Sequence, residues 1–321
     1  MIHVNARHRV WRDAGSRMRF QAAMARETAQ GGPVMAFRKI TCFVTGGARD
    51  AAALGSALLL ATPAKGNVAA LYLRADPRDV MPMVGEGLSG ALIQDLMKSL
   101  EQENKSHAAK ARDHLDKALA AAGGVYCERA PGSDRVSGSF TEAAGVTEDV
   151  MAAAARLSDV TVFPSVAKED RTAVLVGLEA ALLEGGRPLL VASEQTPVVL
   201  GRRVAIAWNG RTQSARALAL AMPLLTGADA VHVLGVDTMR TDAEEAAPVV
   251  DYLAWHNVPA QYHKLSGTGS VAQQLQDACA DVGADLLVMG GYGHSRLREL
   301  ILGGVTRAML NQTTLPLLLA H

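Results

Sequence analysis

The feature that most constrains the fold is an internal duplication. Residues 203–210 repeat the layout of residues 39–46, residues 285–288 repeat 159–162, and residues 316–320 repeat 188–192. Each repeated segment is a short apolar run, which is typical of a buried strand. The first copy is longer, mostly because of the connection over 74–90 and the helix that follows it. The chain therefore holds two copies of one structural unit, one of them elaborated.

Strand-like and helix-like segments alternate through both copies, which indicates βαβ crossovers and a parallel sheet. We expect an α/β protein of two tandem doubly wound domains, each an open, mainly parallel five-stranded sheet with helices on both faces. In the first copy we expect strands at 40–44, 68–73, 125–128, 159–163 and 188–192, and helices at 50–60, 92–122, 141–157 and 172–184. In the second we expect strands at 203–208, 230–236, 260–265, 285–288 and 316–320, and helices at 212–225, 242–256, 270–282 and 305–311.

The predicted boundaries follow from this pattern. Residues 1–35 are rich in Arg and poor in acidic residues, so we expect a mobile N-terminal extension: a targeting segment or, as we favour, a product of an upstream start codon. Residues 36–194 form the first predicted domain and residues 202–321 the second. The segment 193–201, which contains Pro197, links them.

Composition excludes several classes of function. Lys+Arg and Asp+Glu both number 32, so no net charge attracts the chain to nucleic acid or to an anionic membrane. Cys42, Cys127 and Cys279 are far apart and have no ligand-like neighbours, which favours buried free thiols in a reducing compartment. No apolar run approaches the roughly 18 residues of a membrane span. We expect a cytoplasmic protein.

The strongest candidate for a binding site is a group of spaced glycines in the second copy. The apolar run 285–289 ends at Gly290, Gly293 follows after two residues, and Gly303 follows after nine more. A helix-like segment begins at about Val305. Glycines allow backbone N–H groups to approach a ligand closely, and a helix N-terminus offers unpaired donors. This pattern favours a bound phosphate.

This spacing, together with the strand before it and the Pro-led strand after it, resembles the universal stress protein family. Nucleotide-binding members of that family carry Gly-x2-Gly-x9-Gly-Ser/Thr at the end of their fourth strand. The glycine spacing matches, but Gly304 stands where the family has Ser or Thr. With the duplication, the resemblance covers residues 38–321 as a tandem pair of such domains.

The resemblance implies a site for ATP, ADP or AMP, with Mg²⁺ as a candidate companion of the phosphates. Adenine and ribose would lie against the ends of the first two strands of the second copy, and the phosphates against the glycines. The candidate contact residues are Asn209, Gly210, Gly235, Val236, Gly290, Gly293, His294, Gly303, Gly304, Val305 and Thr306. Relatives usually have Asp at the position of Asn209, so the site keeps a polar contact there but loses a charge.

The first copy lacks this glycine pattern. Its fourth strand is followed by Pro164-Ser165-Val166-Ala167, and Pro removes an amide donor. We expect a degenerate domain that supplies an interface and stability, with no nucleotide of its own.

Two other functions stay open. Asn209, Gly304 and the degenerate first copy favour a nucleotide-free interaction scaffold that forms a homodimer through its apolar last strand. The stretch 45–50 weakly resembles the Ser-Gly-Gly-x-Asp-Ser loop of ATP pyrophosphatases, which would make the protein an enzyme. The sequence shows no catalytic triad, paired-carboxylate motif or Walker motif, so we expect a binding role, and we interpret His232 as a satisfied core or strand-end histidine.

Overall fold

The computed structural model describes residues 37–75, 90–129, 134–166, 171–236, 246–291, 304–312 and 314–321. The predicted N-terminal extension therefore lies outside the described residues. The strands are β1 (Lys39–Val44), β2 (Asn67–Leu73), β3 (Val125–Tyr126), β4 (Ser137–Ala143), β5 (Val160–Phe163), β6 (Leu189–Val191), β7 (Arg203–Trp208), β8 (Ala230–Val236), β9 (Ala260–Leu265), β10 (Leu286–Gly290) and β11 (Leu317–Ala320). The helices are α2 (Asp50–Ala61), the 3₁₀ turn η1 (Thr62–Ala64), α4 (Gly90–Ala121), α5 (Thr147–Arg156), α6 (Arg171–Glu184), α7 (Thr212–Leu225), α8 (Ala246–Trp255), α9 (Val271–Asp281) and α10 (Gly304–Gln312).

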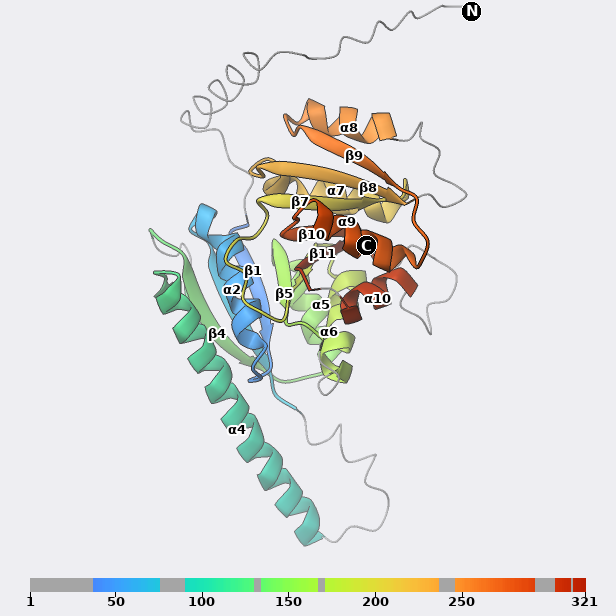
Figure 1. The fold of residues 1–321 in the computed structure, drawn as a ribbon. Coiled ribbons are helices and arrows are strands. Elements are labelled where there is room, and N and C mark those ends of the chain that lie inside the picture. Colours follow the sequence, from blue (N-terminus) through green and yellow to red (C-terminus); the bar gives the residue numbers. More distant parts are fainter. Residues whose placement is uncertain are drawn as a thin grey trace, which may run out of the picture. The chain divides into compact units, whose positions relative to one another are not determined.

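All eleven described strands form one sheet, in the order β3-β4-β2-β1-β5-β6-β11-β10-β7-β8-β9 (Figure 1). Every pairing is parallel except that of β6 with β11, where Leu190 lies opposite Leu318. This antiparallel pair joins the two copies, so the predicted tandem α/β fold and the intramolecular domain pair are confirmed. Both last strands lie inside the sheet. Because β11 lies between β6 and β10, it has no free edge through which another chain could pair. The homodimer itself stays a prediction.

The core lies in two layers, one on each face of the sheet. Alternate strand residues point to opposite faces, so each strand contributes to both layers. One layer packs under α2, α4, α7 and α8, with Leu54, Leu115, Leu218 and Leu253 among its buried residues. The other packs under α5, α6, α9 and α10 and includes Met151, Leu178, Leu275 and Met309. Helices cover both faces of the sheet, as predicted.

One strand was not predicted. The sequence suggested a helix over 141–157, but residues 137–143 form β4, which pairs in parallel with β2, and α5 begins only at Thr147. The predicted strand at 125–128 is reduced to the two-residue edge strand β3. β4 contains Ser137, Gly138 and Ser139 and lacks the apolar run that marks the other strands. A side chain at Gly138 would lie 3.0 Å from Leu119 and 3.1 Å from Leu115, so small residues here allow α4 to pack closely on the sheet.

Several local features of the helices and strands follow directly from the sequence. Helix α7 and strands β8 and β9 have the predicted bounds. Ser270 caps α9, since its side chain accepts a hydrogen bond from the backbone N–H of Gln273 at 3.2 Å. The polar face of α4 is solvated and carries i,i+4 ion pairs such as Lys105–Glu101 and Lys117–Asp113. No helix among the described residues is both long enough and apolar enough to span a membrane.

The β6–β11 joint should control the stability of the whole sheet. Leu190 and Leu318 are 0% and 1% exposed, and we expect Leu190→Ala and Leu318→Ala each to lower the free energy of unfolding by about 2–5 kcal/mol. Because the two residues are direct partners, the double variant should lose less than the sum of the single losses. Urea denaturation measures all three. Leu183→Ala, at an exposed position of α6, is the control and should change stability little. Additive losses at the joint would contradict the coupling.

Candidate functional site

The predicted binding residues of the second copy gather at the carboxyl edge of the sheet. Strand β7 lies between β8 and β10, and Trp208 pairs with Gly235 while Ala207 pairs with Met289. Asn209 follows β7, Gly235 is the penultimate residue of β8 and Gly290 ends β10, so all three lie at the carboxyl ends of neighbouring strands. Helix α10 leads into β11, which is parallel to β10, so the N-terminus of α10 lies at this same edge. This is where ligands bind in open parallel sheets.

Asn209 and Gly210 form the turn that follows β7. The Asn209 side-chain oxygen accepts a hydrogen bond from the backbone N–H of Arg211 at 3.1 Å. Gly210 has φ +68°, in the left-handed region that favours glycine. Both residues are exposed. The side-chain oxygen of Asn209 thus stabilises the turn in which Asn209 lies. The side-chain nitrogen belongs to the same exposed residue.

Gly290 and Gly291 have packing reasons to be glycines. A side chain at Gly290 would lie 2.6–2.7 Å from backbone and Cβ atoms of Gln213 and Ser214 in the first turn of α7. One at Gly291 would lie 2.9 Å from Leu182 on α6, in the other copy. The Gly291 N–H donates to the Ala320 carbonyl at 2.8 Å. These two glycines allow close approach of helices, and the amide of Gly291 is already paired.

Gly304 is different, because it is exposed and no atom of the described residues lies within 4 Å of where its side chain would be. It opens α10, and the first amides of a helix have no intrahelical acceptor. Thr306, two residues after Gly304, is only 4% exposed, so its side chain packs into the protein. Gly293, His294 and Gly303 lie outside the described residues, as does the side chain of Val236.

No pattern in the sequence indicates the contact between Tyr262 and Gly235. The Tyr262 ring, from the neighbouring strand β9, occupies the space beside Gly235: a Cβ added there would collide with its hydroxyl oxygen and lie 2.7 Å from its Cζ atom. Trp208, which is paired with Gly235 across β7–β8, packs on the same core layer. Two aromatic side chains therefore lie on the face of the sheet beside the predicted adenine-binding strand ends. Cross-strand packing of this kind has no local sequence signal.

The carboxyl edge of the first copy is built differently. Helix α4 crosses the turn after β1 so closely that a side chain at Gly46 would lie 2.5 Å from the His107 carbonyl oxygen. Asp50 is fully buried and accepts hydrogen bonds from the backbone N–H groups of Thr45 and Gly46, at 3.0 and 2.7 Å. Burial raises the pKa of the Asp50 carboxyl, and these hydrogen bonds partly oppose the shift. The turn is thus held by a carboxylate from inside the protein.

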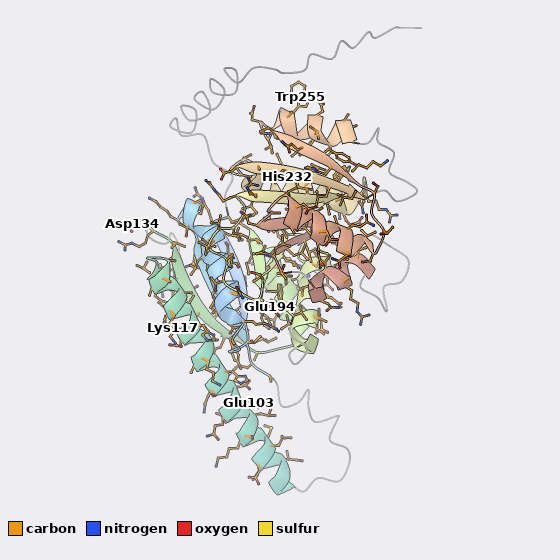
Figure 2. All side chains as sticks on the ribbon, viewed as in Figure 1. Glu103, Lys117, Asp134, Glu194, His232 and Trp255 are labelled. Carbon is orange, nitrogen blue, oxygen red and sulfur yellow. The ribbon has the colours of Figure 1, made fainter. Side chains whose placement is uncertain are left out.

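His232, labelled in Figure 2, is buried, and its ring Nδ1 lies 3.0 Å from Nε2 of His263 on the next strand. Its other nitrogen, Nε2, is buried without a hydrogen-bond partner among the described residues, so the prediction of a satisfied histidine is correct for one ring nitrogen only. Burial, followed by the charges of His263 and Arg203, lowers the pKa of His232 below its ordinary value. This pattern is that of a core histidine kept neutral.

The three cysteines are free. Burial raises the pKa of Cys279 to about 12 and that of Cys42 well above its ordinary value, so both are unreactive thiols at neutral pH. Cys127 is only partly buried, unlike the prediction. Among the described residues, no group of three or more His, Cys, Asp or Glu is placed to hold a metal ion.

The fold and this edge define a tandem, doubly wound α/β protein of the kind that binds ligands at strand ends. Residues 201–321 match the model of the universal stress protein family. No curated protein matches the chain. A universal stress protein from Archaeoglobus fulgidus is 15% identical with a TM-score of 0.60, over 87% of this chain and 97% of its own. A candidate universal stress protein from Pseudomonas aeruginosa is 14% identical with a TM-score of 0.51, over 90% of this chain and 95% of its own.

Residues 201–321 are therefore similar to the domain that defines the universal stress protein family. The two structural likenesses extend over both halves. At such low identity they show the fold alone, and they agree with the duplication seen in the sequence and in the sheet.

An added methyl group should lower the stability of the protein at Gly290 but leave it unchanged at Gly304. Gly290→Ala places a Cβ against the backbone of α7 and should lower the free energy of unfolding by about 1–3 kcal/mol. Gly304→Ala meets no neighbour and should be neutral within about 0.5 kcal/mol. Chemical denaturation of the two variants checks this. Equal losses would show that Gly290 has no special packing role.

The His232–His263 pair should make stability depend on pH. Because the pKa of His232 is lower in the folded state, the unfolded state binds more protons as the pH falls through about 6.5, and stability falls with it. We expect the free energy of unfolding to decline between pH 7.5 and 5.5, and His232→Gln to flatten that decline. His256→Gln, at an exposed histidine, is the control and should leave the slope unchanged. An unaltered slope in His232→Gln would contradict the assignment.

Proposed function

We propose that the C-terminal half binds an adenine nucleotide (ATP, ADP or AMP) and that the protein senses or carries it in a stress response. The observation that supports this most is that the family match covers residues 201–321, the half that retains the glycine spacing. The described parts of that motif lie at one sheet edge, with the open first turn of α10 beside the end of β10. This turn offers unpaired amides and the positive end of a helix dipole to phosphate oxygens.

The neighbouring strand ends would take the rest of the nucleotide. Asn209 and Gly210 follow β7, and Gly235 and Val236 close β8, so together they offer backbone groups and the Asn209 side-chain amide to the ribose and adenine. Trp208 and Tyr262 provide aromatic surface beside them. With an amide in place of the family's Asp, this edge has no carboxylate at position 209, which weakens the case for a metal-bridged phosphate. Mg²⁺ would arrive with the nucleotide.

Binding without catalysis is the role that these residues favour. Asn209 and the glycines contain no nucleophile or general base. His232 has its Nδ1 beside His263 and is buried, which suits a structural role better than proton transfer to a ligand. The nucleotide would therefore be held and released, or hydrolysed only slowly.

Calorimetric titration of the full chain with ATP, ADP and AMP tests this proposal. Gly293→Val should abolish binding while leaving the fold intact. Gly304→Ser should bind ATP about three- to tenfold more tightly, because its hydroxyl can donate a hydrogen bond to a phosphate oxygen at a position with free space.

Gly227→Ser is the matched control for the added hydroxyl, because Gly227 lies in the turn between α7 and β8, at the opposite edge of the sheet. Its affinity should equal that of the unaltered chain. No heat with any of the three nucleotides, from a protein with a normal unfolding transition, would defeat the proposal and leave the scaffold interpretation.

A further inference from the structure

Helix α8 carries the most exposed aromatic side chain among the described residues. Trp255 is 81% exposed, and Tyr252, three residues before it, is 41% exposed. Val249 and Leu253 of the same helix are buried, so they face the core while the two aromatic side chains face solvent. Tryptophan and tyrosine gain the most when a partner covers them, and they are the residues enriched at the centres of protein interfaces.

The outer face of α8 carries little charge. Its exposed residues within the described part are Ala247, Pro248, Asp251, Tyr252, Ala254 and Trp255. Asp251 is the only charged residue among them, whereas the exposed face of α4 carries several ion pairs. Figure 1 shows α8 at the margin of the sheet beside β9, the last strand in the sheet order, and Figure 2 shows Trp255 at that margin. This face is therefore accessible, and it has too few charges to select a strongly charged partner.

Four of these residues form one stripe along the helix. Pro248, Asp251, Tyr252 and Trp255 occupy positions i, i+3, i+4 and i+7, which lie on the same side of a helix. The steps between them are three, one and three residues, so the stripe has the same spacing when it is read in the opposite direction. An antiparallel copy of α8 would therefore place Trp255 on the partner's Pro248, and Tyr252 beside the partner's Asp251. A twofold axis would repeat both contacts.

The residues that meet in this arrangement are chemically complementary. Proline rings pack on aromatic side chains in many complexes, and a tyrosine hydroxyl can donate a charge-assisted hydrogen bond to a carboxylate. Each Asp251 would lie opposite a tyrosine, so the two like charges do not meet. The ring of Tyr252 already stacks on that of His256, with the centroids 4.8 Å apart, which restricts the ring before any partner binds.

We propose that a second copy of this chain docks on α8, with the two α8 helices packed antiparallel across a twofold axis. This face can serve a homodimer, whereas β11 has β6 on one side and β10 on the other. Because α8 has 10 residues, it is only about 15 Å long and the interface is small. The dimer is therefore weak, and its population rises with protein concentration.

Sedimentation equilibrium of the full chain over a range of concentrations tests this proposal. The parent chain should pass from monomer to dimer as the concentration rises. Trp255→Ala should raise the dissociation constant of the dimer at least about tenfold, because it removes the central aromatic contact. Tyr252→Asp should do the same, because the introduced carboxylate faces the partner's Asp251. Adding Asp251→Lys to Tyr252→Asp should restore most of the affinity, since each new ammonium group then faces a new carboxylate.

Leu157→Ala is the matched control for Trp255→Ala, because it also truncates an exposed apolar side chain, 72% exposed, and lies in the N-terminal half. It should leave the dissociation constant unchanged. Thermal unfolding shows whether each variant is folded, and Trp255→Gln replaces Trp255→Ala if the latter is not. The proposal is overturned if the parent chain stays monomeric at every concentration, if Trp255→Ala dimerises as the parent does, or if the double variant recovers no affinity.

Discussion

The pairing of β6 with β11 is the interaction on which the rest of the structure depends. Three residue pairs, Leu317–Val191, Leu318–Leu190 and Leu319–Leu189, turn two sheets into one. All six side chains are buried. In a separate domain each of these strands would be an edge, with unpaired N–H and C=O groups open to another chain. Pairing them within the chain satisfies those groups and leaves β3 and β9 as the outer strands.

The joint also brings the first half against the carboxyl edge of the second. Leu182 of α6 lies against Gly291, immediately after β10, and His321 Nδ1 lies 3.2 Å from the Gly291 carbonyl oxygen. Gly291, the residue directly after β10, is thus supported by Leu182 of the first half and by His321. A half that lacks the glycine motif can still set the geometry of the half that has it.

Most of the fold could be predicted from the sequence because buried parallel strands are apolar runs and the chain repeats them. The helix over 212–225 and the strands over 230–236 and 260–265 were predicted with the bounds that they have. β4 was missed because its residues are small and polar for a tertiary reason, the close packing of α4. The site was predictable only as far as the ends of strands. Three contacts join residues from different strands or from the turns that follow them, and no local pattern in the sequence indicates them. They are the contact of Tyr262 with Gly235, that of His232 with His263, and the ion pair of Arg49 with Glu194.

The glycines of the motif show why spacing alone does not define a binding site. A glycine is required wherever backbone approaches backbone, whether the neighbour is a ligand or a helix. Gly290 meets the first turn of α7 and Gly291 meets α6, so their lack of side chains is already explained by packing. Gly304 has no such neighbour. An exposed glycine at a helix N-terminus leaves its amide accessible, whereas a buried one does not. Within the described part of the motif, the first turn of α10 therefore favours a bound anion more than the glycines that end the strand do.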